Sequence, residues 1–194
     1  GTLDGLKSFN MLSGAISSLD EDKEGYPIRK LKVRALLKDS RGRLWIGGEN
    51  GLATYRNTDG QLERCDIQHN ASPLQSVFVQ SIYESTTKLI WIATRTGLWC
   101  YDDKENTFSH YTSDDGLAND IIDGIEEDSY GRLWLSTDNG LSCFNPFSGT
   151  FRNFSTSDGL QSNQFNPGSH CRRRNGEIMF GGIYGICSFT PSTI

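Results

Sequence analysis

Long apolar runs are missing from this chain of 194 residues. No stretch approaches the roughly 18 consecutive apolar residues that a transmembrane helix needs, and the chain does not open with a charged segment followed by an apolar one. We therefore expect a soluble piece that makes no membrane contact, with any targeting signal outside it. Sustained 3.6-residue periodicity is missing as well, so helices should be nearly absent.

A basic excess is also missing. The formal net charge is -5, and the one basic run, Arg172–Arg174, is short. Proteins that bind nucleic acid without sequence preference usually carry a clustered basic surface, so nucleic acid is not expected as a partner.

The cysteines and histidines form no metal-binding pattern. The 5 cysteines are odd in number, none belongs to a C-x-x-C pair, and the 3 histidines are scattered. This argues against a zinc site, any other metal site and a dense disulfide framework. We expect no cofactor.

What the sequence does contain is a repeat. The segment LWIGGENGLATY (44–55) recurs as IWIATRTGLWCY (90–101), LWLSTDNGLSCF (133–144) and IMFGGIYGICSF (178–189). The glycine before the second apolar residue falls at positions 51, 97, 140 and 185, at intervals of 46, 43 and 45 residues, and Gly5 lies another 46 residues upstream. The chain therefore holds four copies and a truncated fifth at its start, with units that end near residues 9, 55, 101, 144 and 189.

Each copy has the pattern of four short strands. A V-x-x-L/I segment is followed by a polar turn, the tryptophan-bearing strand, the G-L strand and an F-x-x-Y/F run such as 108–111 or 151–154. Four such strands in a repeated unit are typical of a β-propeller blade, whereas a β-sandwich needs no repeated unit. We therefore predict an all-β propeller of about four four-stranded blades plus the truncated one, as one segment over residues 1–194.

The glycines of LWIGGENGL serve the blade in this interpretation. Gly47 and Gly48 suit crowding near the central channel, and Gly51 can take a positive φ in a hairpin turn. A phosphate-binding loop would lead into a helix and carry Lys-Ser/Thr, which this segment lacks. Cys100 and Cys143 occupy equivalent places in successive blades and are predicted to be buried thiols.

With the repeat written out, the chain resembles the regulator-propeller (two-component regulator propeller) repeats in the sensor region of bacterial hybrid two-component histidine kinases. The resemblance rests on D-x-x-G-x-L-W-I/L-G/S, x-x-G-L-x-x-Y/F, F-x-x-Y/F and S-D-G-L-x-S/N, and it covers nearly the whole chain. It implies seven-bladed propellers, often two in tandem, on the periplasmic side of an inner-membrane kinase. The last unit, 158–194, resembles the closing blade before that family's immunoglobulin-like domain.

Four blades and a fragment fall short of seven. The resemblance therefore implies a segment of a larger propeller, whose partners are the remaining blades and the immunoglobulin-like domain. A closed four-bladed ring, with the N-terminal strands completing the last blade, is the alternative. The last unit lacks an F-x-x-Y strand, and an exposed blade edge is prone to pairing, so self-association as a homodimer is also predicted.

One face of the propeller gathers the candidate ligand contacts. If LWIGG is the second strand, the turn after it shares a face with the connector that enters the innermost strand. The candidates on this face are Glu49, Asn50, Arg95, Asp138, Asn139, Tyr184, Asn119, Asp120, Asn163 and Gln164. Such a polar ring suits hydrogen bonding to an oligosaccharide, with Arg95 available for a carboxylate or sulfate. The alternative is that these are ordinary solvated turn residues.

No catalytic residue is predicted. Asp39 and Asp128 occupy the same turn of different blades and are expected to accept backbone N–H groups there. The two carboxyls that a glycosidase needs on a common cleft cannot be placed. Three functions stay open: a glycan-sensing, signal-transmitting segment of a periplasmic sensor, which we favour; a structural or dimerising scaffold; and a hydrolase or lyase that acts on polysaccharide.

Overall fold

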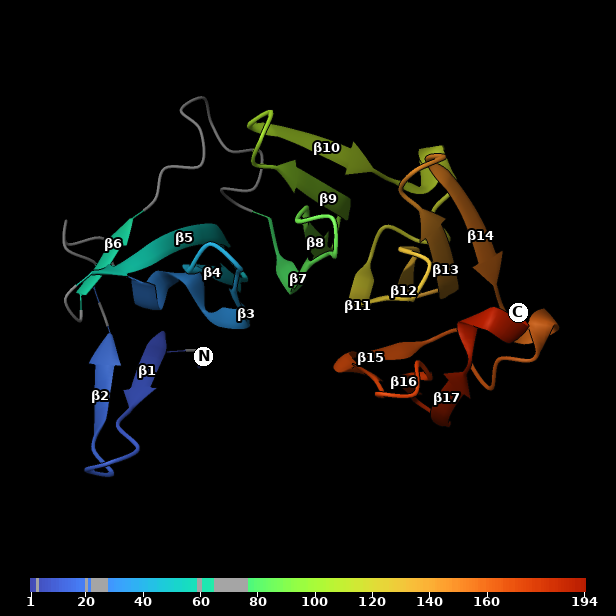
Figure 1. Ribbon diagram of the computed structural model, residues 1–194. Coiled ribbons are helices and arrows are strands. Elements are labelled where there is room, and N and C mark those ends of the chain that lie inside the picture. Colours follow the sequence, from blue (N-terminus) through green and yellow to red (C-terminus); the bar gives the residue numbers. More distant parts are fainter. Residues whose placement is uncertain (3, 20, 22–27, 59–60, 65–76) are drawn as a thin grey trace. The chain divides into compact units, whose positions relative to one another are not determined.

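The computed structural model describes residues 1–2, 4–19, 21, 28–58, 61–64 and 77–194. Every regular element in these residues is a β-strand or a short 3-10 helix, which confirms the all-β prediction (Figure 1). The chain divides into two compact units, unit 1 (Gly1–Ile82) and unit 2 (Tyr83–Ile194). One propeller segment over 1–194 stays a prediction.

Unit 1 holds a hairpin and a four-stranded blade. In the hairpin, β1 (Leu6–Phe9) pairs antiparallel with β2 (Ile16–Leu19). The 3-10 helix η1 (Ile28–Leu31) precedes the blade. The blade has the order β3 (Val33–Lys38), β4 (Arg43–Gly48), β5 (Gly51–Thr58) and β6 (Gln61–Arg64). Because Gly5 precedes β1 as Gly51 opens β5, the hairpin matches the third and fourth strands of a blade, which is the predicted truncated copy.

Three further sheets follow along the chain. The second blade has β7 (Val79–Glu84), β8 (Ile90–Thr94), β9 (Gly97–Asp102) and β10 (Thr107–Tyr111). The third has β11 (Ile122–Glu127), β12 (Leu133–Thr137), β13 (Gly140–Asn145) and β14 (Thr150–Phe154). The fourth has only three strands, β15 (Phe165–Arg172), β16 (Ile178–Gly182) and β17 (Gly185–Phe189). The sequence predicted that this sheet differs from the four-stranded ones, because the last unit lacks the F-x-x-Y run.

Three short 3-10 helices complete unit 2. The connectors between its blades carry η2 (Ser113–Asp115) and η3 (Thr156–Asp158), and η4 (Pro191–Thr193) follows β17. The innermost strands β11 and β15 lie side by side (Figure 1). The tryptophan-bearing segments form the second strand of their blades, as predicted.

The hydrophobic core of unit 2 lies between neighbouring blades. Trp91 and Trp134 are each 1% exposed. Trp91 meets Phe144 of the next blade edge-on, with ring centroids 5.7 Å apart. Trp134 packs against Phe189 of the last blade with tilted rings, whose planes meet at 52° and whose centroids are 4.5 Å apart. Burial of side chains this size contributes about 2–3 kcal/mol each, so the interblade contacts stabilise the unit substantially.

Glycines allow the close approach of strands that the sequence predicted. In unit 1 a Cβ atom on Gly47 would collide with the side chain of Val79, which opens the next innermost strand. Gly51, Gly97 and Gly140 have φ of 118°, 113° and 100°, a conformation that glycine adopts without strain. Cys100 and Cys143 are buried free thiols, as predicted, whereas Cys65 lies outside the described residues.

Candidate functional site

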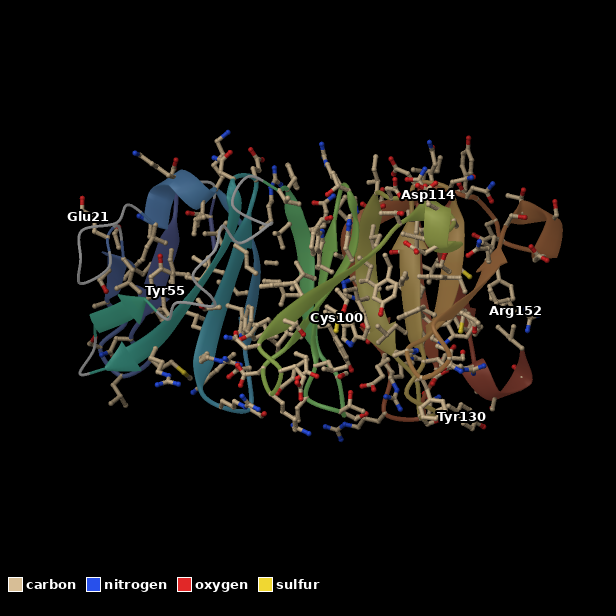
Figure 2. The ribbon with its side chains drawn as sticks, turned by 90° about the horizontal axis from the view of Figure 1, so that it is seen from above. Glu21, Tyr55, Cys100, Asp114, Tyr130 and Arg152 are labelled. Atoms are coloured by element: carbon tan, nitrogen blue, oxygen red, sulfur yellow. The ribbon has the colours of Figure 1, made fainter. Side chains whose placement is uncertain are left out.

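Hairpin turns and connectors meet on one face of unit 2. The backbone N–H of Gly97 donates to the carbonyl of Asp120 at 2.8 Å, and the N–H of Gly140 donates to the carbonyl of Asn163 at 2.7 Å. Each bond joins the turn of one blade to the connector that enters the next. We call this the ring face; in unit 2 it comprises the turns 95–96, 138–139 and 183–184 and the connector segments 118–121 and 161–164. Figure 2 shows that Asp114, on a connector, and Tyr130, in a turn between first and second strands, lie at opposite edges of the unit.

The connectors are held by their own side chains. Asp120 Oδ1 accepts from the N–H of Ser113 at 2.7 Å, and Asn163 Oδ1 accepts from the N–H of Thr156 at 2.8 Å. Asn119 Oδ1 accepts from the N–H of Ile121 at 2.9 Å. These three predicted ligand residues therefore hold the loop shape with the same oxygen atoms that a ligand would use.

The other predicted residues of the ring face in unit 2 are accessible to solvent. Arg95, Asp138, Asn139 and Gln164 are exposed, and Tyr184 is 75% exposed. Asn139 Oδ1 lies 3.4 Å from the amide nitrogen of Asn163, so these two side chains connect neighbouring blades. In unit 2 the structure thus brings the predicted residues onto one face, with Tyr184 beside a small hollow that Gln161 and Ser162 also line.

Glu49 and Asn50 occupy the corresponding turn of unit 1. Glu49 forms ion pairs with Lys32 at 3.0 Å and Arg34 at 2.6 Å. The hydrogen bond from Arg34, followed by that from Lys32, lowers the pKa of Glu49. Asn50 donates to the carbonyl of Lys30 at 2.7 Å.

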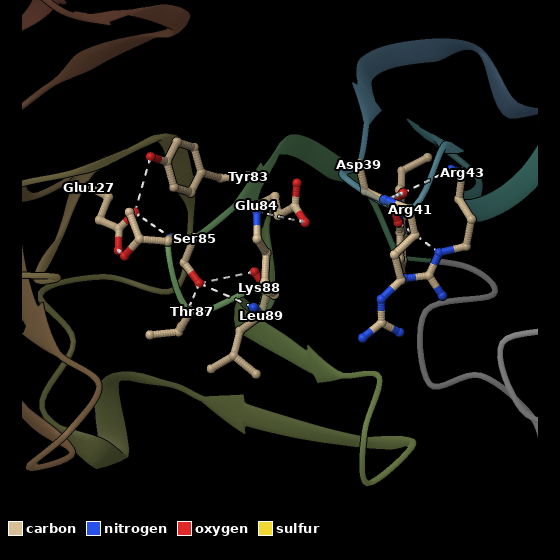
Figure 3. Close-up of polar contacts among 12 residues, drawn as sticks. Asp39, Arg41, Arg43, Tyr83, Glu84, Ser85, Thr87, Lys88, Leu89 and Glu127 are labelled. Atoms are coloured by element: carbon tan, nitrogen blue, oxygen red, sulfur yellow. Dashed lines mark hydrogen bonds and ion pairs between the residues drawn. The ribbon is translucent and has the colours of Figure 1, made fainter.

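Asp39 and Asp128 have the structural role that the sequence predicted. Asp39 accepts from the N–H of Arg41 at 3.0 Å and the N–H of Arg43 at 2.8 Å (Figure 3). It also accepts from Nε of Arg43 and, at 2.8 Å, from Nε1 of Trp45. Burial by itself would raise the pKa of Asp39, but the hydrogen bonds from Trp45 and Arg43 outweigh it and lower that pKa.

Asp128 repeats this arrangement in unit 2. It accepts from the N–H of Tyr130 and from Nε of Arg132 at 2.8 Å and 2.7 Å, and from Nε1 of Trp134 at 2.9 Å. Here too burial would raise the pKa, and the hydrogen bonds, that from Trp134 foremost, lower it. All acceptor positions of these carboxylates are used within their turns, so neither is placed for acid–base chemistry.

The innermost strands carry a polar cluster that the sequence did not single out. His170 Nδ1 lies 2.9 Å from Glu126 Oε1, which joins β15 to β11. Glu127 accepts from the N–H and the hydroxyl of Thr86 at 2.9 Å and 2.7 Å, and lies 3.4 Å from the hydroxyl of Tyr83 (Figure 3). Burial, and then the charge of Glu127, raise the pKa of Tyr83 to about 12. Glu126 and His170 are 44 residues apart, so the repeat period was the signal that could have paired them.

Two kinds of site are not found in the described part of the chain. No group of three or more His, Cys, Asp or Glu side chains there could hold a metal ion. No helix there is both long and apolar enough to cross a membrane.

One family model matches two segments of the chain. The family model described as two component regulator propeller matches residues 28–50 and 116–139. These matches end at Asn50 and Asn139, which are equivalent positions of the first and third full copies. The comparison with curated proteins found no match.

Solved structures with the same fold include bacterial sensors. The chain is 28% identical to the extracellular domain assigned to the hybrid two component system BT3049 from B. thetaiotaomicron, with a TM-score of 0.82 over 98% of this chain and 26% of that one. For the extracellular domain assigned to the hybrid two component system BT4673 of the same organism, identity is 23% and the TM-score 0.77, over 97% of this chain and 25% of that one. A streptogramin B lyase has 20% identity and a TM-score of 0.70, over 98% of this chain and 60% of that one.

These findings confirm the β-propeller prediction and support a signalling propeller. The chain spans about a quarter of the length of the two sensor ectodomains. The lyase shares the fold, and its identity is too low to carry its activity to this chain.

Proposed function

We propose that this chain, whose repeats are two-component regulator propeller repeats, is a non-catalytic sensing segment of a hybrid two-component system and recognises a glycan on its ring face. The proposal places the segment in the periplasm, in the ectodomain of an inner-membrane histidine kinase. Its similarity to two extracellular sensor domains supports this location.

The observation that carries the proposal is the set of exposed polar side chains on a fixed backbone. Asp138 and Gln164 are exposed, while their backbone groups are held by bonds between N–H of Asp138 and the carbonyl of Ile121, and between N–H of Ile183 and the carbonyl of Gln164. A fixed backbone beneath these side chains suits the binding of a sugar, because less backbone conformational entropy is lost on binding.

Two further side chains fit the same class of ligand. Tyr184 offers an exposed aromatic ring that can pack against the apolar face of a sugar. Arg95 offers a guanidinium that can pair with the carboxylate or sulfate of an acidic sugar. Acidic or sulfated oligosaccharides are therefore the first ligands to test.

The bonds between turns and connectors suggest how binding could be transmitted. Asp120 and Asn163 each fix a connector by the side chain and the preceding blade's turn by the carbonyl. A ligand that moves a connector therefore changes the contact between two blades. In this proposal the signal leaves the ring face as a change in blade packing.

Calorimetric titration of the chain with a panel of neutral, uronic-acid and sulfated oligosaccharides tests the proposal. We expect saturable binding of at least one member, without conversion of the sugar. Release of products during incubation would instead favour the hydrolase or lyase alternative, and no binding to any member would favour the scaffold.

A further inference from the structure

Two polar side chains inside the third blade hold one connector of the ring face. Ser142 on β13 is buried, and its hydroxyl accepts from the N–H of Ala118 at 3.0 Å. The same hydroxyl donates to Oδ1 of Asn153 on β14 at 2.7 Å. The amide nitrogen of Asn153 returns to the connector and donates to the carbonyl of Gly116 at 2.9 Å. We call Ser142 and Asn153 the connector clamp.

The clamp completes the backbone hydrogen bonds of the connector. The N–H of Gly116 donates to the carbonyl of Ser113 at 3.1 Å, and the N–H of Leu117 donates to the carbonyl of Thr112 at 3.2 Å. The carbonyl of Gly116 and the N–H of Ala118 bond to the clamp instead. A partly buried backbone group that loses its partner is costly, so the connector depends on the clamp at this point.

The second blade shows that the fold itself does not require this pair. Trp99 and His110 occupy the same two repeat positions, and they face each other across β9 and β10 as Ser142 and Asn153 do across β13 and β14. Their rings stack, with centroids 3.9 Å apart and planes at 12°. A blade therefore accepts two aromatic rings where the third blade has two hydrogen-bonding groups. The clamp serves the connector rather than the strand pair.

The clamped connector joins the ring-face turns of two blades. The carbonyl of Asp120 accepts from the N–H of Gly97 at 2.8 Å, in the turn that also bears Arg95. The carbonyl of Ile121 accepts from the N–H of Asp138 at 3.1 Å. The backbone positions of Arg95 and Asp138, which belong to neighbouring blades, therefore depend on one connector.

We infer that Ser142 and Asn153 are positioning residues of the glycan site and act on Asp138 through the connector 116–121. The inference rests on the proposed function, because it concerns the same ligand. Ser142 is buried, and Asn153 uses both amide atoms within the clamp, so both act without contact to the ligand. A connector without its clamp leaves the backbone of Asp138 freer, and more conformational entropy is then lost when a ligand fixes it.

Two measurements on the intact chain test the clamp, and the first needs no ligand. In Ser142→Ala the N–H of Ala118 loses its acceptor. Amide hydrogen exchange should therefore be about tenfold faster over residues 117–121 and at Asp138 than in the unmodified chain. In calorimetric titration, the panel oligosaccharide that binds the unmodified chain best should bind Ser142→Ala about five- to tenfold more weakly.

Asn153→Ala breaks the clamp at its other end. Asn153 lies at an exposed position, so this variant keeps the test open if Ser142→Ala does not fold. It should reproduce both effects of Ser142→Ala. Because the two side chains act as a unit, the double variant should add little to either single variant.

Ser85→Ala is the matched control. Ser85 is buried, and its hydroxyl bonds to Thr87 and Leu89 in the turn between β7 and β8, at the opposite edge of the unit. The variant also loses a buried hydroxyl, so urea denaturation should report a comparable loss of stability. Exchange over 117–121 and the affinity for the oligosaccharide should stay unchanged.

Three results would overturn the inference. Unchanged exchange over 117–121 in Ser142→Ala would show that the clamp does not hold the connector. Faster exchange with unchanged affinity would remove the positioning role, and equal weakening by Ser85→Ala would assign the effect to lost stability. If no oligosaccharide binds the unmodified chain, the proposed function fails and the positioning role with it, and the exchange measurement then decides separately whether the clamp holds the connector.

Discussion

Trp134 donates its indole N–H to Asp128 across 2.9 Å, and Trp45 donates to Asp39 across 2.8 Å in the equivalent turn. Asp128 is 2% exposed and also accepts from Arg132. An asparagine there would set an amide N–H₂ against these donors. We predict that Asp128→Asn lowers the free energy of unfolding by about 3 kcal/mol, measured by urea denaturation. An effect below about 0.5 kcal/mol, the size expected at an ordinary surface position, would contradict this role.

The same carboxylates predict an acid-sensitive fold. Their folded-state pKa values lie below the ordinary value of 3.8. Between the lowered and the ordinary pKa the unfolded chain binds more protons than the folded one, so stability falls as pH falls. The contribution is complete above the ordinary pKa and is lost as pH drops through the lowered value. Thermal unfolding from pH 7 to pH 2 should show this loss, and Asp128→Asn should reduce its size.

Trp91 stands where Trp45 and Trp134 stand, but its buried indole nitrogen has no hydrogen-bond partner among the described residues. Ser85 takes the place of the aspartate and bonds instead to Thr87 and Leu89 (Figure 3). Leu89 takes the place of the arginine.

We predict that Ser85→Asp and Leu89→Arg are coupled favourably, by about 1–3 kcal/mol, because together they rebuild the turn of Asp128. Ser85→Asp alone should stabilise little or destabilise, since the buried carboxylate would lack its cation. Unfolding free energies of both single variants and the double variant give the coupling. Simple additivity would show that the turn does not work as a unit.

Gly124 on β11 lies against the imidazole of His170 on β15, where a Cβ atom would collide with Cδ2. Gly124→Ala should therefore destabilise unit 2 by about 1–3 kcal/mol. In a His170→Ala background, which lacks the imidazole ring, Gly124→Ala should lower the free energy of unfolding much less. An equal loss of unfolding free energy in both backgrounds would contradict the close packing of β11 on β15.

The repeat allowed much of the fold to be predicted from the sequence. The spacing of Trp45, Trp91 and Trp134 placed the second strand of each blade, and Gly51, Gly97 and Gly140 placed the hairpin turns. These features are local, because a strand and its turn lie within a few residues of each other.

The roles of side chains in the connectors and the contacts between blades were harder to predict. The sequence grouped Asn119, Asp120 and Asn163 as ligand residues, whereas their side-chain oxygens hold the connectors. It also missed the pair of Glu126 and His170. Such contacts depend on which side chains meet after the blades pack, and periodicity alone does not state their orientation.

The central claim is recognition of a glycan on the ring face of unit 2. The most direct test is calorimetric titration of the panel oligosaccharide that binds best, with the unmodified chain, with Asp138→Ala, and with Tyr130→Ala as the control on the opposite edge of the unit (Figure 2). The account predicts about tenfold weaker binding for Asp138→Ala, the loss of about one hydrogen bond to a charged group, and unchanged binding for Tyr130→Ala. Equal affinities for all three proteins would contradict it.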